Sequence, residues 1–130
     1  MFLYKFDKVH TATVVKRPSK ICKTPYVADI TLNEDDTSTE YMAHTACLGC
    51  CGLVEAGEQV IMTDSTNAKN KCKYRVMLAK SSERGVSNII GVNPKMAEDL
   101  VEIALKSNYI SRLKNVKNYM REKKNVEFKI

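Results

Sequence analysis

The chain has 130 residues, the size of one domain, and its hydrophobic fraction of 44% is enough for a core, which argues against a disordered chain. No apolar run approaches the ~20 residues needed to span a bilayer, so we expect no membrane partner. A net charge of +6 favours an anionic partner, and five cysteines, an odd number, favour a reducing cytoplasmic compartment over a disulfide framework. We therefore expect an intracellular protein.

Alternating apolar and β-branched residues predict five strands, separated by loops that carry Pro, Gly or runs of charge. The strands are expected over residues 9–16, 26–32, 40–45, 58–63 and 73–78. Between the third and fourth strands, the small and apolar residues 46–56 predict a single helical turn or a tight connector. A further short apolar run, residues 89–92, is typical of a buried strand.

One helix is predicted over residues 94–106. The Asn93 side chain can cap its first free N–H groups, and Pro94 suits the first helical position, where no hydrogen-bond donor is missed. Residues at helical spacing form an apolar stripe that should face inward. The stripe consists of Met96, Leu100, Ile103 and Ala104. Asn108 is a reasonable stop signal, and the tail that follows should be strand-like or loose.

Five strands with a helical connector between the third and the fourth is the element order of an OB-fold, a small Greek-key barrel. We therefore predict a mainly β protein, a five-stranded OB-type barrel with one C-terminal α-helix. The barrel is expected over residues 1–92. The helix and tail, residues 93–130, are expected to pack on the barrel or to follow it within a single domain.

Basic side chains cluster in two predicted loops, which in an OB-fold flank the binding face. Such folds bind single strands through a charged groove and through aromatic rings that stack on bases. The candidate nucleic-acid-binding residues are Lys16, Arg17, Lys20, Lys23, Tyr26, Lys69, Lys71, Lys73, Tyr74 and Arg75, with Tyr41 as a further stacking ring. The alternative is that these are solvated charges and core tyrosines.

Possible soft metal ligands are concentrated in the stretch 44–51. A zinc site built from His44, Cys47, Cys50 and Cys72 is conceivable, but no second Cys-x-x-Cys pair accompanies the first. Cysteines in a tight turn are more often small buried hydrophobes, so we predict no metal and no other cofactor. No Gly-x-Ser-x-Gly elbow and no Gly-rich phosphate loop occurs, so the sequence carries no enzyme signature.

Short segments along the chain form an ordered set of motifs. They are Tyr26-Val27-Ala28-Asp29, His44-Thr45-Ala46-Cys47-Leu48, Glu55-Ala56-Gly57-Glu58-Gln59-Val60, Asn70-Lys71 before Tyr74-Arg75-Val76-Met77-Leu78, and Ile90-Gly91-Val92-Asn93 before the helix. This set, which covers nearly the whole chain, resembles the N-terminal half of the sugar fermentation stimulation protein A family. The chain departs from the family pattern at His44, Ala46, Asn70 and Glu98.

The resemblance implies an OB-fold-like domain of a DNA-binding family. It also implies that the nuclease-like second half, with its paired acidic residues and Lys, lies outside this sequence, so cleavage is not expected. We predict non-enzymatic binding of nucleic acid, DNA rather than RNA, through the basic groove. The alternative is a structural or assembly module from a family that has lost its catalytic half, with residues 111–130 contacting a protein partner.

Overall fold

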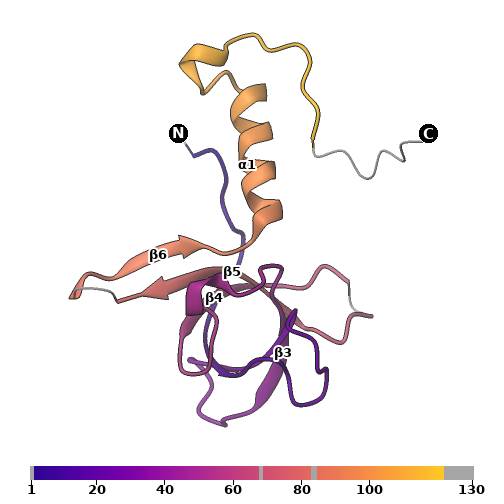
Figure 1. Ribbon diagram of the computed structural model, residues 1–130, viewed down its shortest axis with the longest axis vertical. Helices are drawn as coiled ribbons and strands as arrows, with labels where there is room; N and C mark the ends of the chain where they lie inside the picture. The colour runs from indigo at the N-terminus through magenta and orange to yellow at the C-terminus, as the bar shows by residue number, and fades with distance from the viewer. Residues whose placement is uncertain (1, 68, 83–84, 122–130) are drawn as a thin grey trace, which may run out of the picture.

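The computed structural model describes residues 2–67, 69–82 and 85–121, and these residues form six strands and one α-helix (Figure 1). In chain order the elements are β1 (His10–Lys16), β2 (Val27–Leu32), β3 (Glu40–His44), β4 (Gln59–Asp64), β5 (Tyr74–Ser81), β6 (Asn88–Gly91) and α1 (Pro94–Lys106). The connector between β3 and β4 contains a single 3-10 turn, Cys50–Gly52, as predicted. The predicted mainly β fold is therefore confirmed.

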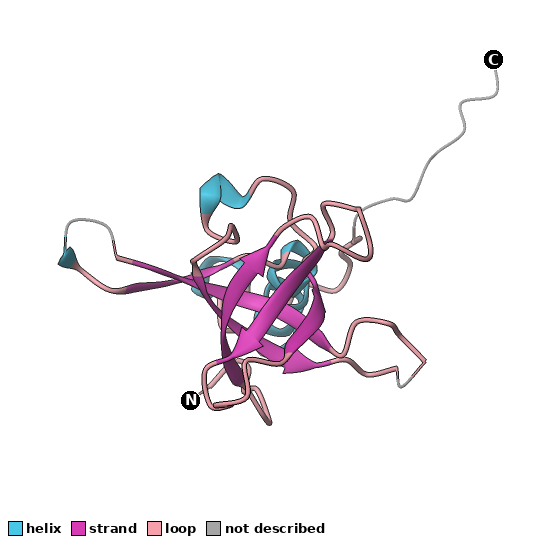
Figure 2. Cartoon of the chain, turned by 90° about the horizontal axis from the view of Figure 1, so that it is seen from below, coloured by secondary structure: helices cyan, strands magenta, loops and turns pink. Residues whose placement is uncertain are grey.

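Strand pairing closes five of the strands into a barrel, which is seen end-on in Figure 1 and from the side in Figure 2. The strand order is β3-β2-β1-β4-β5-β6, and every neighbouring pair is antiparallel. A parallel pairing of β3 with β5, Ala43 with Tyr74 and His44 with Arg75, joins the ends of the five-stranded ring. This is the strand order of an OB-type barrel, as the sequence predicts.

The barrel interior is filled by alternate residues of its strands, as a period of two requires. The buried side chains include Ala12, Val14, Ala28, Ile30, Ala43, Val54, Val60, Met62, Val76 and Ala79. Four of these ten residues are alanines, which occupy little volume. The larger side chains of Ile30 and Met62 therefore fill much of the barrel interior. Val54, which is fully buried, comes from the connector after the 3-10 turn and completes the core.

A strand does form near residues 89–92, but the prediction that it is buried is wrong. β6 pairs only with the second half of β5, and together they form a ribbon that extends beyond the barrel (Figure 1). All four β6 residues are exposed, Ile89 by 60%, and only Val92 after the strand is buried. A short apolar run does not reveal whether a strand lies in a core or on a projecting ribbon.

Helix α1 begins and ends where the sequence predicts. The Asn93 side chain accepts a hydrogen bond from the Met96 backbone N–H at 3.3 Å, and Pro94 occupies the first turn. Asn108, with a φ of 54°, supplies the left-handed residue that follows the helix. The helix rises from the barrel rather than lying on it (Figure 1), so of its apolar stripe only Ala104 is fully buried.

The described part of the tail returns along the acidic side of α1. The guanidinium of Arg121 meets Glu98, Asp99 and Glu102 at 2.8–3.0 Å, and the Tyr119 hydroxyl donates to Glu102 at 2.8 Å. Between the helix and these contacts lies a 3-10 turn, Ser111–Leu113, and residues 107–121 contain no strand. Residues 122–130 of the predicted partner-binding segment lie outside the described residues.

No helix among the described residues combines the length and the apolar character needed to cross a membrane.

Candidate nucleic-acid interface

The first loop, between β1 and β2, is anchored by a buried polar pair that the sequence analysis did not identify. Asp29 on β2 is only 4% exposed; it accepts hydrogen bonds from the Ser19 hydroxyl at 2.6 Å and from the Lys20 backbone N–H at 2.8 Å. The Ser19 oxygen in turn accepts from the backbone N–H groups of Ile21 and Cys22. A charge-assisted network of this kind fixes the backbone that presents Lys20.

Arg17, a predicted nucleic-acid contact, is engaged with protein groups in the structure. Its Nε donates to the Pro25 carbonyl oxygen at 2.8 Å, one terminal nitrogen donates to the Cys47 carbonyl oxygen, and the other lies 3.8 Å from the Cys50 sulfur. The guanidinium therefore ties the first loop to the connector after β3. A role for Arg17 in binding nucleic acid stays a prediction.

The two basic loops do come together, at a hollow of about 360 Å³ beside Tyr41. This Tyr41 hollow is lined by Lys20 from the first loop and by Lys71 and Lys73 from the loop before β5. The Lys73 ammonium lies 5.2 Å from the centre of the Tyr41 ring, a cation–π contact. Two carboxylates also line the hollow: the buried Asp29, and Glu40, which pairs with Lys20 at 3.2 Å.

A second hollow, of about 410 Å³, lies on the other side of Lys71. It is lined by Lys71, by Arg75 on β5 and by Lys95 in the first turn of α1, together with His44 and polar side chains. Among the residues that the structure describes, no carboxylate lines this cationic hollow. Three cations from separate elements therefore face one concave surface, which favours an anion there.

Lys95 is the functional candidate that sequence reasoning missed. It stands directly after Asn93 and Pro94, in the first turn of α1, where no acidic residue occurs. A cation at a helix N-terminus is unfavourable, because the helix dipole places partial positive charge there. A lysine at that position is a signal that could have pointed to an anion-binding role.

The three candidate stacking rings divide into one exposed ring and two packed ones. Tyr26 is 41% exposed and stacks on His44, with ring centres 6.5 Å apart and planes 12° from parallel. Tyr41 and Tyr74 pack edge to face at 5.6 Å and rest against the barrel core. Burial is the main reason that the pKa of Tyr74 is raised above its ordinary value. Tyr26 is thus the ring open to a base.

The surroundings of the His44 ring, which stacks on Tyr26, favour its neutral form. Its pKa is lowered from the ordinary value of 6.5, first by partial burial and second by the nearby Arg75 guanidinium. His44 and Arg75 are neighbours because they are register partners in the parallel pairing of β3 with β5. The stacked Tyr26–His44 pair therefore presents an uncharged π surface next to the cationic hollow.

Other predicted residues lie apart from these hollows. Lys16, Lys23 and Lys69 are exposed, and none of them lines the Tyr41 hollow or the cationic hollow. The candidate zinc ligands are not assembled either. Among the described residues, no three His, Cys, Asp or Glu side chains form a group that could hold a metal ion.

The thiols of the proposed zinc set have other surroundings. The Cys50 sulfur contacts the Cys47 carbonyl oxygen at 3.3 Å, and its pKa is raised, mainly by burial. Cys72 lines the cationic hollow with His44, and burial followed by the neighbouring Cys22 raises its pKa as well. All five cysteines carry free thiols.

The closed ring of five strands in OB order, with cations gathered beside β3 and β5, defines the class as an OB-type barrel protein. No family model matches the chain. Its sequence is 31% identical over 117 residues to a sugar fermentation stimulation protein homolog of Pseudoalteromonas translucida, covering 89% of this chain and 44% of that relative. A homolog of the same name from Alteromonas mediterranea is 27% identical over 110 residues, which is 85% of this chain and 42% of the relative.

Among solved structures, SfsA of Pyrococcus furiosus in complex with Ca²⁺ matches with a TM-score of 0.71 and 14% identity. The match covers 98% of this chain and 49% of that chain, and it shows that the two share a fold. Over most of its length the chain is thus similar to part of the sugar fermentation stimulation proteins, which confirms the resemblance that its ordered motifs predict, and the match is consistent with the N-terminal half. It spans about half the length of the relatives it matches.

Proposed function

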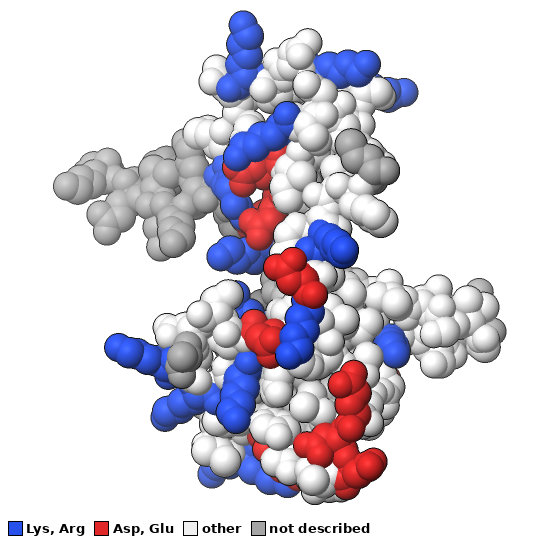
Figure 3. Space-filling view, turned by 180° about the vertical axis from the view of Figure 1, so that it is seen from behind, with Lys and Arg blue, Asp and Glu red and all other residues white. Residues whose placement is uncertain are grey.

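We propose that this domain binds nucleic acid without catalysing a reaction, DNA in preference to RNA, through the surface formed by the cationic hollow and the Tyr41 hollow. The observation that carries the proposal is the convergence of Lys71, Arg75 and Lys95 on one hollow that no carboxylate lines. Polyanion binding depends on such unbalanced cations, which replace the counterions of phosphates. On the face of the barrel shown in Figure 3, most Lys and Arg side chains lie toward one edge and a group of Asp and Glu toward the other, and the two kinds mix between them.

Two further observations support nucleic acid over another polyanion. The exposed Tyr26 ring and the neutral His44 ring form a stacking surface next to the cations, as base-binding OB-folds require. The resemblance to a DNA-binding family favours DNA. The Tyr41 hollow adds Lys73 and Lys20 on the far side of Lys71, so a strand that passes over Lys71 meets cations in both directions.

Fluorescence anisotropy with labelled strands of about 20 nucleotides, single-stranded and duplex, over a salt series tests this proposal. The variant combines Lys71→Gln, Arg75→Gln and Lys95→Gln. We expect an affinity loss of about tenfold or more, and a salt slope that falls by about two to three units because each lost phosphate contact removes roughly 0.7–0.9. The control is Lys114→Gln with Lys117→Gln, which removes charge from the tail outside both hollows.

Equal losses in the two variants would show that net charge alone drives binding, and they would contradict a localised interface. If wild-type protein fails to bind any strand near physiological salt, the proposed function is wrong. The second candidate, a protein-assembly module, would then be favoured. It has its own supporting observation, since apolar side chains stand exposed at Ile89 and Ile90 on the ribbon, at Val101 on the helix and at Tyr109 after it.

The carboxylate of Glu40 is expected to oppose binding. It lines the Tyr41 hollow and pairs with Lys20 at 3.2 Å. Glu40→Gln removes that charge and releases Lys20, so affinity for single-stranded DNA should rise about two- to fivefold, the scale of one exposed ion pair. Anisotropy at fixed salt measures the change, and Glu34→Gln in the turn after β2 is the control. Unchanged affinity for Glu40→Gln would place the bound strand away from this hollow.

A further inference from the structure

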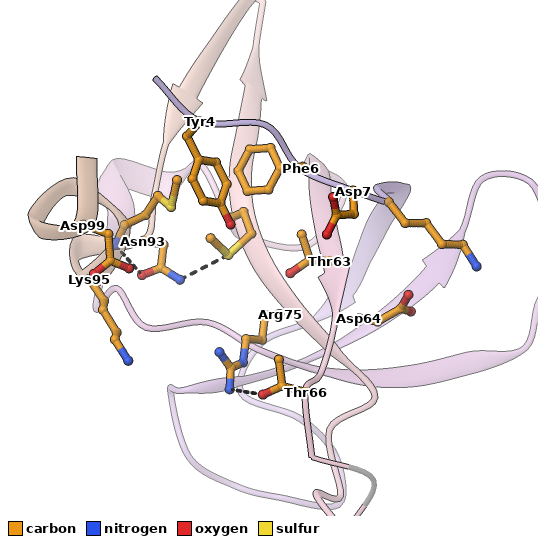
Figure 4. A pocket seen from close by; sticks show the side chains of 13 residues that line it. Tyr4, Phe6, Asp7, Thr63, Asp64, Thr66, Arg75, Asn93, Lys95 and Asp99 are labelled. Carbon is orange, nitrogen blue, oxygen red and sulfur yellow. Dashed lines mark hydrogen bonds between the residues drawn. The ribbon is translucent and has the colours of Figure 1, made fainter. Parts of the chain in front are cut away.

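A third hollow shares a wall with the cationic hollow. It has a volume of about 360 Å³, and Arg75, Asn93 and Lys95 line both spaces. Its opposite end is formed by the N-terminal segment before β1, which brings Tyr4 and Phe6 over β5 and the start of α1 (Figure 4). We call this space the aromatic hollow. Arg75 and Lys95 therefore line one part of it and the two aromatic rings another, and Lys8 of the N-terminal segment also lines the space.

The aromatic end is suited to a flat apolar group. The Tyr4 and Phe6 rings pack edge to face with centres 5.2 Å apart, and the thioethers of Met77 and Met96 line the same space. Tyr4 is 47% exposed, so part of its ring remains open to a ligand. Aromatic rings and methionine side chains together adapt well to the face of a planar ring.

Carboxylates also line the aromatic hollow, which disfavours a phosphate against them. Three aspartates line it: Asp7, Asp64, which lies 3.0 Å from His10, and Asp99, which pairs with Arg121 at 2.8 Å. Carboxylates repel a phosphate but accept hydrogen bonds from N–H groups. A ligand that suits both ends is uncharged, planar and rich in N–H donors, and it is attached to a phosphate that remains at Arg75 and Lys95. A nucleobase in a strand fits this description.

We propose that the aromatic hollow takes one unstacked nucleobase of a single-stranded nucleic acid, while the adjoining phosphate lies between Arg75 and Lys95. This inference rests on the proposed function and adds strandedness to it. In a duplex, the base is paired and stacked, and extruding it costs additional free energy. The subsite uses the N-terminal segment and α1, so it lies beyond the strand face on which Tyr26 and His44 stack.

The test compares two single strands of equal length and equal phosphate number, one with bases and one made wholly of abasic residues. Wild-type protein should bind the base-bearing strand more tightly, and Tyr4→Ala should reduce this preference at least about fivefold, the lower limit for one stacked base. The salt slope should not change, because Tyr4→Ala removes no cation. Tyr4→Phe should retain the preference, and Tyr119→Ala, which changes a tyrosine that does not line the aromatic hollow, should leave it intact.

The inference is overturned if Tyr4→Ala keeps the full preference for bases, or if wild-type protein binds duplex as tightly as the single strand. The proposed function survives either result, because it depends on Lys71, Arg75 and Lys95 and on the salt slope. If no strand binds at all, both fail together. Tyr4 lies outside the barrel strands, so thermal unfolding of Tyr4→Ala should match wild type and exclude misfolding as the cause.

Discussion

Arg17→Ala is expected to lower the free energy of unfolding by about 2–3 kcal/mol, the scale of hydrogen bonds to a charged group. The guanidinium bonds the carbonyl oxygens of Pro25 and Cys47, which belong to two different loops. Without it, both acceptors lose a charged donor, and the first loop is no longer tied to the connector after β3. Urea unfolding followed by circular dichroism measures the change.

Lys16→Ala is the matched control for Arg17→Ala, because Lys16 is an exposed cation next to it in sequence. Its effect on stability should stay within about 0.5 kcal/mol. The salt slope of nucleic-acid binding should hardly change for Arg17→Ala when binding is measured well below the unfolding transition. Unchanged stability together with a loss of one unit of salt slope would contradict the structural role and return Arg17 to the interface.

Asp29→Ala is expected to cost a similar amount, about 2–3 kcal/mol, because a buried carboxylate with charge-assisted hydrogen bonds is removed. The Ser19 hydroxyl and the Lys20 backbone N–H lose their acceptor, and the first loop loses its anchor on β2. Hydrogen exchange over residues 17–26 should accelerate in the variant, together with a lower urea midpoint.

Ser19→Ala separates the two hydrogen bonds of Asp29. It removes the hydroxyl donor but leaves the Lys20 N–H bond, so about 1–1.5 kcal/mol should be lost. Exchange over residues 17–26 that matches wild type in Asp29→Ala would show that the loop has another anchor.

The barrel could be predicted because its determinants are local. Alternation along β1, β2 and β4 places Val14, Ile30 and Met62 inside, and the same alternation is visible in the sequence. The helix start is equally local, since Asn93 and Pro94 act on the first turn alone. The environment of β6 is not local. Ile89 is exposed because the β5–β6 ribbon projects beyond the barrel. This projection depends on how far β5 extends past the strands that pair with it in the barrel.

The site was only partly predictable for the same reason. The loops that carry Lys20, Lys71 and Lys73 could be placed side by side from the OB order alone. The engagement of Arg17 could not, because its acceptors are backbone carbonyls of segments distant in sequence. The contribution of Lys95 required knowing that α1 begins beside β5, and the contribution of Tyr4 required the path of the N-terminal segment.

The parallel pairing of β3 with β5 makes the barrel a ring with one short joint. Two residue pairs hold this joint, whereas each of the other four junctions has four or five pairs, and parallel pairing is slightly less stable per residue. Local opening of the barrel therefore requires the least free energy between β3 and β5, while the other strand pairs remain hydrogen-bonded. His44 on β3 and Arg75 on β5 face each other in this pairing. A ligand that contacts both residues should therefore stabilise the closed barrel.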